Sequence, residues 1–242
     1  MRILGIDTAT SIASAALIED DCIIAEQIHG SPDCSQTTTL KANHAEVVLP
    51  LVEAVLRDAA VSLRDLSGLA VSIGPGSFTG LRIGLSTVKG LAYGLEIPVV
   101  GVSTLLANAA RVENFTGSIC SFLDARKQEV YAALFRRAGD GLTRITQDRA
   151  AGATEIAELA GKLTGGPCLF IGDGAIKYEK LLMDAFGNRA ILTAGDKYPS
   201  LASAVARLSQ KQIRENDGNS LTALVPIYLR PAEAELNTTN QA

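Results

Sequence analysis

The chain has 242 residues, of which 47% are hydrophobic and 20% are charged, and its formal net charge is −4. This length suffices for one large domain or two small ones with a sizeable core. The negative charge argues against a protein that grips a phosphate backbone unaided, so any role on nucleic acid would require a basic partner.

The sequence predicts a cytoplasmic protein without a membrane segment. Its apolar runs are too short to span a bilayer, and Met1-Arg2 leads directly into a short strand rather than a signal peptide. The cysteines are isolated from one another and from histidine, which predicts free thiols and no metal site. They are Cys22, Cys34, Cys120 and Cys168.

An antiparallel meander is expected first, from three short apolar runs separated by polar turns. These runs are Arg2–Asp7, Ser11–Ile18 and Cys22–Ile28. A polar loop over Ser31–Lys41 follows. Asn43 then caps a helix with Glu46 three residues on, and Pro50 should kink this helix or mark its start.

The stretch Val71–Gly94 combines a strand, a glycine-proline turn and a helix. Gly74-Pro75-Gly76 must reverse the chain, and Ser77 or Thr79 can cap the helix that ends near Gly94. The helix contains four glycines, each of which costs about 1 kcal/mol relative to alanine. They are Gly80, Gly84, Gly90 and Gly94. Close approach by another element would compensate for them.

Further strands at Leu66–Ile73 and Ile97–Val102 flank this helix and predict a parallel portion of sheet. A helix over Leu105–Val112 should follow. A second meander is then expected, with a turn at residues 139–141. Its strands are Ser118–Asp124, Glu129–Phe135 and Leu142–Gln147.

The two meanders match each other in sequence and spacing. Gly5-Ile6-Asp7 and Phe122-Leu123-Asp124 each end a strand on aspartate, and an Ala-Ala-Leu run follows eight residues later in both. This repetition predicts a duplicated domain. We place the first half at residues 1–103, joined by the segment 219–231, and the second at 104–218.

The remaining chain predicts a strand at Cys168–Ile171, a glycine turn at 172–174 and a helix over Ala175–Phe186. A helix over Ser200–Gln210 follows, then a polar segment over 211–220 and a frayed tail after Pro231.

Two groups of residues could bind a nucleotide. A strand-end aspartate beside threonines can hold hydrated Mg²⁺ while backbone N–H groups meet phosphate, and a Gly-x-Gly turn can approach an adenosine. The candidates are Asp7, Thr8, Thr10, Asp124, Gly172 and Gly174. The alternative is that these residues satisfy turn backbone and close a tight turn.

No catalytic or metal site is evident in the sequence. Gly74-x-Gly76 before a helix invites an anion, but the Gly-Lys-Ser/Thr ending of a P-loop is missing. His29 and His44 are the only histidines, too few for a histidine-rich metal site, and no serine has a recognisable relay.

Two helices instead offer a protein interface. Small residues along one stripe let a second helix approach closely, and apolar residues around the helix after Asn43 cover a wider arc than one core contact needs. The candidates are His44, Val47, Val48, Leu51, Val55, Gly80, Gly84 and Thr87. Complete burial of the first helix in the core is the alternative.

Several segments resemble the bacterial TsaB family, which serves tRNA threonylcarbamoyladenosine biosynthesis. The most specific is Gly74–Gly84, GPGSFTGLRIG. The others are Gly5–Thr10, His44–Glu46, Leu49–Pro50, Gly101–Leu105, Asp124–Arg126 and Tyr228–Pro231.

The resemblance implies an α/β protein of the actin/Hsp70/sugar-kinase (ASKHA) fold, with two duplicated halves and mixed sheets. It also implies a catalytic paralogue, TsaD, whose two metal-binding histidines align with Thr104 and Asn108. Threonine and an amide cannot replace two imidazoles on a transition metal. The family thus implies a non-catalytic scaffold for TsaD, with the ATPase TsaE as a further partner and tRNA reached only through the complex.

The same helices should make a homodimer when the chain is alone. No cofactor is required in this hypothesis, although a vestigial cleft could retain weak ATP or ADP with Mg²⁺. A small-molecule kinase of the same fold remains an alternative; such enzymes carry Asp-x-Gly-Asn, whereas Thr8-Ala9-Thr10 follows Asp7 here. A protease is a third candidate function, and the sequence argues against it because no nucleophilic relay is recognisable.

Overall fold

Two mixed β-sheets with helices on their faces make up the computed structural model, which describes residues 1–30, 43–139 and 141–230. The first sheet has the strand order β3-β2-β1-β4-β5. Its strands are β1 (Arg2–Asp7), β2 (Ala13–Glu19), β3 (Cys22–His29), β4 (Gly68–Gly74) and β5 (Val99–Ser103). Helices α1 (His44–Asp58) and α2 (Phe78–Leu95) and the short 3₁₀-helix η1 (Leu63–Asp65) accompany it.

The second sheet has the order β11-β10-β6-β7-β8, and β9 also pairs with β7. Its strands are β6 (Gly117–Asp124), β7 (Glu129–Ala138), β8 (Gly141–Arg144), β9 (Arg149–Gly152), β10 (Cys168–Ile171) and β11 (Ala190–Thr193). The remaining helices are α3 (Thr104–Ala110), α4 (Ala153–Leu163), α5 (Asp173–Lys177), α6 (Glu179–Phe186), η2 (Gly187–Arg189) and α7 (Leu201–Arg214).

The two sheets repeat one topology, which confirms the predicted α/β fold with duplicated halves and mixed sheets. In the first, β1 pairs antiparallel with β2 and parallel with β4, which pairs parallel with β5. In the second, β6 pairs antiparallel with β7 and parallel with β10, which pairs parallel with β11. Both central strands, β1 and β6, end on the aspartate that the sequence comparison paired, Asp7 and Asp124.

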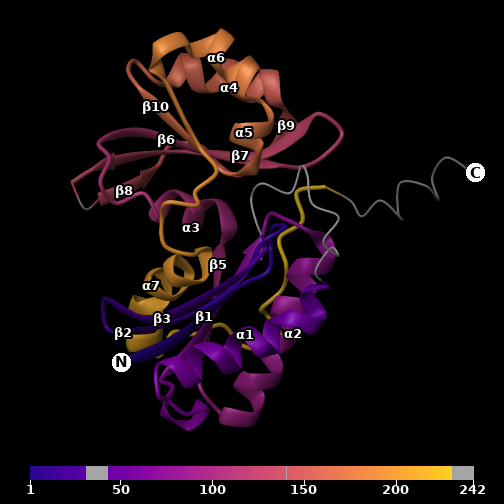
Figure 1. The fold of residues 1–242 in the computed structure, drawn as a ribbon, viewed down its shortest axis with the longest axis vertical. Helices are drawn as coiled ribbons and strands as arrows, with labels where there is room; N and C mark the ends of the chain where they lie inside the picture. Colours follow the sequence, from indigo (N-terminus) through magenta and orange to yellow (C-terminus); the bar gives the residue numbers. More distant parts are fainter. Residues whose placement is uncertain (31–42, 140, 231–242) are drawn as a thin grey trace, which may run out of the picture.

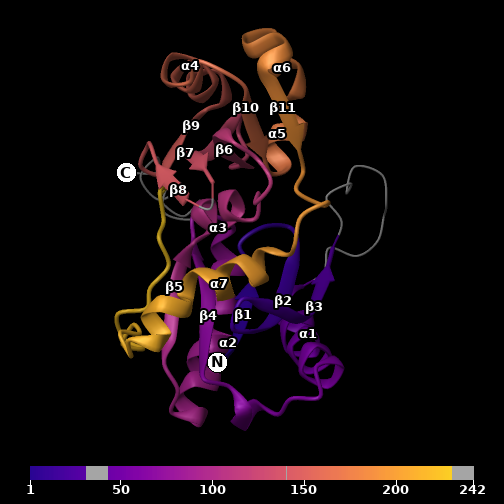
Figure 2. The same cartoon turned by 90° about the vertical axis from the view of Figure 1, so that its left-hand side faces the viewer.

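The halves lie one above the other, with α3 at the level where they meet and α7 just below it in the first half (Figure 1). Helices α1 and α2 cover one face of the first sheet and α7 covers the other (Figure 2). Helix α3 has buried residues in both cores, since Ala107 joins the core of α7 and Leu105 joins the core of the second sheet. The halves therefore share a packed junction.

The placement of α7 corrects the predicted division of the chain, which assigned residues 104–218 to the second half. Leu201 and Val205 of α7 pack with Ile3 and Val100 of the first sheet, so residues 201–214 complete the first half. The sequence could not reveal this return, because an apolar helix face does not say which sheet it covers.

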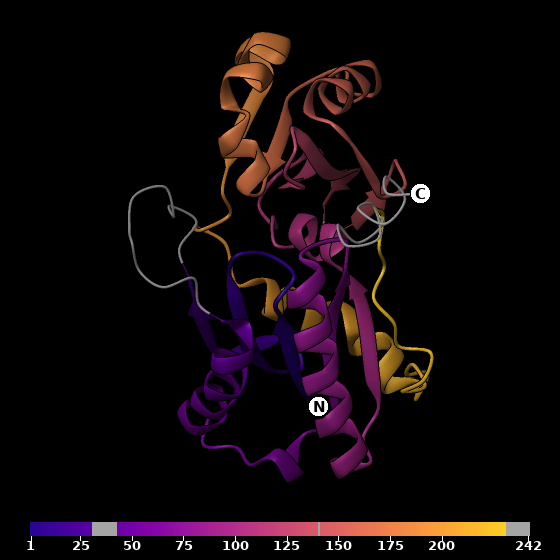
Figure 3. The ribbon, with the colours of Figure 1, turned by 90° about the vertical axis from the view of Figure 1, so that its right-hand side faces the viewer.

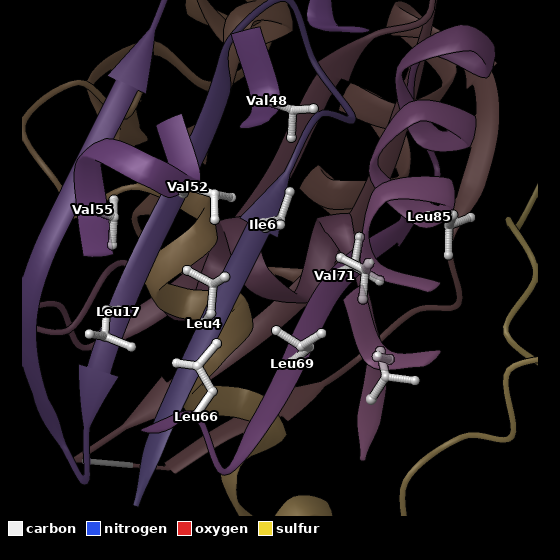
Figure 4. Packing of buried hydrophobic residues seen from close by; sticks show 14 of the residues in the cluster. Leu4, Ile6, Leu17, Val48, Val52, Val55, Leu66, Leu69, Val71 and Leu85 are labelled. Atoms are coloured by element: carbon white, nitrogen blue, oxygen red, sulfur yellow. The ribbon is translucent and has the colours of Figure 1, made fainter. Parts of the chain in front are cut away.

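Helix α1 begins as predicted, with the Asn43 side chain accepting from the Ala45 N–H and donating to Glu46. Pro50 lies inside this helix and does not mark its start. The buried valines of α1 point toward β1, β2 and β4 (Figure 4). They are Val48, Val52 and Val55.

Other helix limits differ in part from the predictions. Ser77 caps α2 as expected, but this helix runs past Gly94 to Leu95, and Glu96 takes the left-handed conformation there. The single helix expected over Ala175–Phe186 is two, α5 and α6, which meet at Tyr178. β9, α4 and β11 were not predicted.

Some predictions lie outside the described residues: the loop at 31–41 including Cys34, the centre of the turn at 139–141, and the tail after Pro231. Within the described chain, Cys22 is exposed, and Cys120 and Cys168 are buried and unpaired. None of the described helices is both long and apolar enough to cross a membrane.

Candidate functional site

The turn after β1 is buried where α2 begins. Asp7 and Thr8 are each 1% exposed. The Thr8 hydroxyl donates to the Gly80 carbonyl at 2.7 Å, and the Ser77 N–H donates to the Ala9 carbonyl at 2.7 Å. The first residues of α2 therefore rest directly on this turn.

Burial raises the pKa of Asp7 from its ordinary value near 3.8 to about 6. The Ala9 N–H, 3.4 Å from a carboxylate oxygen, and the charge of Arg111 lower the pKa in part. The Thr10 hydroxyl is occupied by the backbone of Ile12, which it both donates to and accepts from. Asp7 and Thr10 therefore bond the backbone of their own turn, and Thr8 bonds the backbone of α2.

At the equivalent place in the second half, Lys177 of α5 forms an ion pair with the Asp124 carboxylate. The Nζ–Oδ2 distance is 2.7 Å, and the other carboxylate oxygen accepts from the Arg126 N–H at 3.0 Å. The hydrogen bond to Asp124 is the main reason that the pKa of Lys177 is raised. A cation of the chain itself thus sits where the sequence suggested Mg²⁺.

The glycines of the 172–174 turn accommodate the protein's own main chain. A Cβ at Gly174 would lie 2.8 Å from the Phe122 carbonyl oxygen, and one at Gly172 would lie 2.6 Å from it. Gly172 also has a φ of +129°, which a side chain would strain. Between them, Asp173 accepts from the Asp124 and Gly174 N–H groups, and burial raises its pKa.

The residues at the two strand ends therefore do not fit a bound Mg²⁺–nucleotide. Each suggested ligand is engaged within the chain, and the described residues include no group of three or more His, Cys, Asp or Glu side chains suited to a metal ion.

Thr104 and Asn108, the positions that the family resemblance predicts to align with metal ligands of the paralogue, are also buried, and the Asn108 amide is hydrogen-bonded within the fold. Its amide donates to the Ser121 hydroxyl and to the Ile171 carbonyl, each at 3.0 Å, and accepts from Arg111. Thr104 is fully buried. These contacts tie α3 to β6 and to the end of β10.

Arg111, which the sequence analysis did not single out, completes this junction. Its guanidinium donates to the Pro199 carbonyl at 2.6 Å and to the Gly195 carbonyl. Burial lowers its pKa to about 10, so it stays charged at neutral pH. The sequence signal that could have identified Arg111 is an arginine within an otherwise apolar helical pattern.

The structure corrects the role expected for Gly80 and Gly84. Both are buried, and a Cβ at either would overlap Thr8, at its carbonyl oxygen for Gly80 and at its hydroxyl for Gly84. These glycines make room for the chain's own turn after β1, not for another protein.

The open glycines of α2 are Gly90 and Gly94. Within the described part of the chain, no side chain or other segment lies within 4 Å of a Cβ placed on either. Ser86 continues the exposed line one turn earlier, and Tyr93 beside it is 80% exposed. Leu49 of the neighbouring α1 is 48% exposed. We call these five exposed residues on the neighbouring helices α1 and α2 the α1–α2 outer face.

The other suggested interface residues divide between core and edge. Val48 and Val55 are buried in the first core, which corrects their assignment to an interface. Leu51 packs partly against that core. The rest are partly exposed, namely His44, Val47 and Thr87, and burial lowers the pKa of His44.

Two copies of one sheet topology, each with an aspartate ending its central strand, define the actin/Hsp70/sugar-kinase class of fold. ROK hexokinase from Thermus thermophilus superimposes with a TM-score of 0.51 at 11% identity, covering 89% of this chain and all of that one. YeaZ from Pseudomonas aeruginosa superimposes with a TM-score of 0.72 at 24% identity, covering 94% of this chain and 100% of that one.

Within this class, residues 35–238 match the family model described as TsaD, tRNA N6-adenosine threonylcarbamoyltransferase. The chain is also 34% identical over 235 residues to the tRNA threonylcarbamoyladenosine biosynthesis protein TsaB of Bacillus subtilis, covering 97% of this chain and 96% of that protein. The chain belongs to the TsaB family, as its sequence motifs predicted, and so to tRNA threonylcarbamoyladenosine biosynthesis.

Proposed function

We propose that the chain is a non-catalytic subunit that binds the catalytic paralogue TsaD through the α1–α2 outer face. The observation that carries this proposal is the exposed stripe of Ser86, Gly90 and Gly94 on α2. Two open glycines one turn apart cost helix stability, and they let a partner helix approach the backbone closely. Tyr93 and Leu49 beside the stripe supply apolar contact area.

The state of the strand ends supports a role without chemistry of its own. Lys177 neutralises Asp124, and the Thr8 hydroxyl is bound to Gly80. Asn108 stands where a metal-binding histidine would be needed, and its amide is fully used. We therefore propose that the chain needs no cofactor and acts by influencing the conformation of its partner TsaD.

The same outer face would also serve self-association. In the absence of TsaD, two copies can oppose their glycine stripes and form a homodimer that competes with the heterodimer. With a net charge of −4, the chain would meet tRNA only within the complex, and the ATPase TsaE would join that complex as a third protein.

The test is to replace Gly90 by leucine and titrate the variant against TsaD by calorimetry. Since the Cβ position is open, the isolated helix should gain up to about 1 kcal/mol of stability. The added side chain would separate the two helices, so affinity should fall at least about tenfold, which corresponds to about 1.4 kcal/mol.

The matched control is Gly161→Ala in α4, a helical glycine of the other half with only Phe186 nearby, at 3.9 Å. It should bind TsaD like the parent chain. Parental affinity for a folded Gly90→Leu variant would refute the interface. The Gly84→Leu exchange is unsuitable here, because it collides with Thr8 inside the fold.

A further inference from the structure

The last described residues, 219–230, form a segment without helix or strand, with one turn at 221–223, that runs along the side of the molecule from the first half to the second (Figure 2). We call this segment the strap. The chain otherwise passes between the halves at α3 and again before α7, so the strap is an additional connection that closes from outside (Figure 3).

The strap is anchored first on the edge strand of the first sheet. The Asn219 N–H donates to the Val99 carbonyl at 2.8 Å, and the Asn219 side chain accepts from the Gly101 N–H at 2.8 Å. Leu224 is 2% exposed and belongs to the first core. These contacts anchor the beginning of the strap in the first half.

Its middle is fastened to the start of α2. The Ile227 N–H donates to the Ile73 carbonyl at 2.7 Å. The Tyr228 ring stacks on Phe78 with centroids 4.8 Å apart, and its hydroxyl accepts from Arg82 Nε at 3.0 Å. The Arg82 guanidinium lies over the Phe78 ring at 3.8 Å, which completes a three-residue stack.

Its end contacts the β6–β7 hairpin of the second half through Arg230. The Arg230 guanidinium donates to the Ala125 carbonyl at 2.9 Å and pairs with Glu129 at 2.8 Å. Both side chains are partly exposed, at 21% and 38%. The Glu129 oxygen of this pair is buried, but a single ion pair between partly exposed side chains stabilises less than the core packing of Leu224, so the end of the strap can detach while Leu224 stays in the core.

We propose that the strap is a releasable clamp that fixes the orientation of the two halves, with Tyr228 as its fastener on the first half and Arg230 on the second. When Arg230 is attached, the β6–β7 hairpin is tied to the start of α2. When it is detached, the halves can rotate about the α3 junction, as in hinged two-domain proteins. The proposal depends only on contacts within this chain and not on the binding of TsaD.

The test measures the distance between the halves by pulsed electron paramagnetic resonance. Spin labels go on Glu53→Cys in α1 and Glu179→Cys in α6, both exposed positions, in a chain whose Cys22 and Cys34 are replaced by serine. Arg230→Ala should widen the distance distribution about twofold, because the halves gain a hinge motion. Glu129→Gln removes the same ion pair from the other side and should widen it similarly.

Arg126→Ala is the matched control, an exposed arginine on the same hairpin that should leave the distribution unchanged. Circular dichroism establishes that each variant is folded; if Arg230→Ala unfolds, Glu129→Gln decides. A parental width in the folded variants would overturn the clamp, and so would equal widening in Arg126→Ala.

Discussion

The two ends of α2 carry glycine pairs with the same spacing and opposite surroundings. Gly80 and Gly84 are buried against Thr8, whereas Gly90 and Gly94 face open space. A helix turns by about 100° per residue, so the ten residues from Gly80 to Gly90 rotate the second pair by about 80° relative to the first. The angular position of a glycine around the helix axis therefore decides whether it packs against the rest of the fold or faces outward.

The difference is also energetic. At the inward pair, a side chain would collide with the turn after β1, so glycine is required by the fold itself. At the outward pair, glycine lowers helix stability by about 1 kcal/mol per residue and nothing among the described residues of the chain fills the space. We propose that the partner helix fills this space.

The largest effect is expected for Gly80→Ala. Its Cβ would overlap the Thr8 carbonyl and lie 3.2 Å from His44 Nδ1. Overpacking of this kind should lower the free energy of unfolding by about 3 kcal/mol, measured by urea denaturation. Gly94→Ala is the counterpart and should raise stability slightly. Equal losses in both variants would contradict the assignment of inward and outward pairs.

Asp7→Asn tests whether the buried carboxylate of Asp7, in the turn that packs against Gly80 and Gly84, destabilises the folded protein when it is ionised. Burial raises the pKa of Asp7 to about 6, so the folded state binds a proton more tightly than the unfolded state. Between about pH 4 and 6, ionisation must therefore cost the folded protein increasing stability, up to about 3 kcal/mol by pH 7.

The stability of the Asp7→Asn variant minus that of the parent should accordingly increase from pH 4 to pH 7, measured by urea denaturation at each pH. A difference that does not change with pH would mean that Asp7 has the same pKa in the folded and unfolded states. A difference that decreases with pH would mean that Asp7 is stabilised as an anion, with Arg111 as the nearest charged candidate.

The smallest effect is expected for Lys177→Met, which removes the ion pair with Asp124 and keeps the side-chain stem. Lys177 is 47% exposed, so its loss should cost less than about 1 kcal/mol at pH 7. The raised pKa of Lys177 means that this stabilisation is present at neutral pH and lost only in strongly alkaline solution. Calorimetry should give unchanged affinity for TsaD, because α5 lies away from the outer face.

Much of the fold was predictable because local sequence patterns indicate it. Strand-end aspartates at Asp7 and Asp124, with matching runs after them, revealed the duplication before any coordinates. Asn43 and Ser77 marked two helix starts through capping. The membership of α7 in the first half was not predictable, because its packing partner Ile3 lies about 200 residues earlier in the chain.

The candidate site was predicted less well, because it depends on which groups are already engaged. Asp124, Thr8 and Gly174 have the chemistry of a nucleotide site, but Lys177, Gly80 and Phe122 occupy them. Nor could the sequence tell Gly84 from Gly90, since both are small residues in one helix and only the packing of the helix sets their direction.

The most direct test of the α1–α2 outer face is site-specific photocrosslinking to TsaD. A benzophenone amino acid would replace Tyr93, the most exposed aromatic residue of α2, and in a second variant Glu179 on α6 of the other half. We predict a covalent adduct with TsaD from position 93 and none from position 179. An adduct from position 179 with none from position 93 would contradict the proposed docking surface.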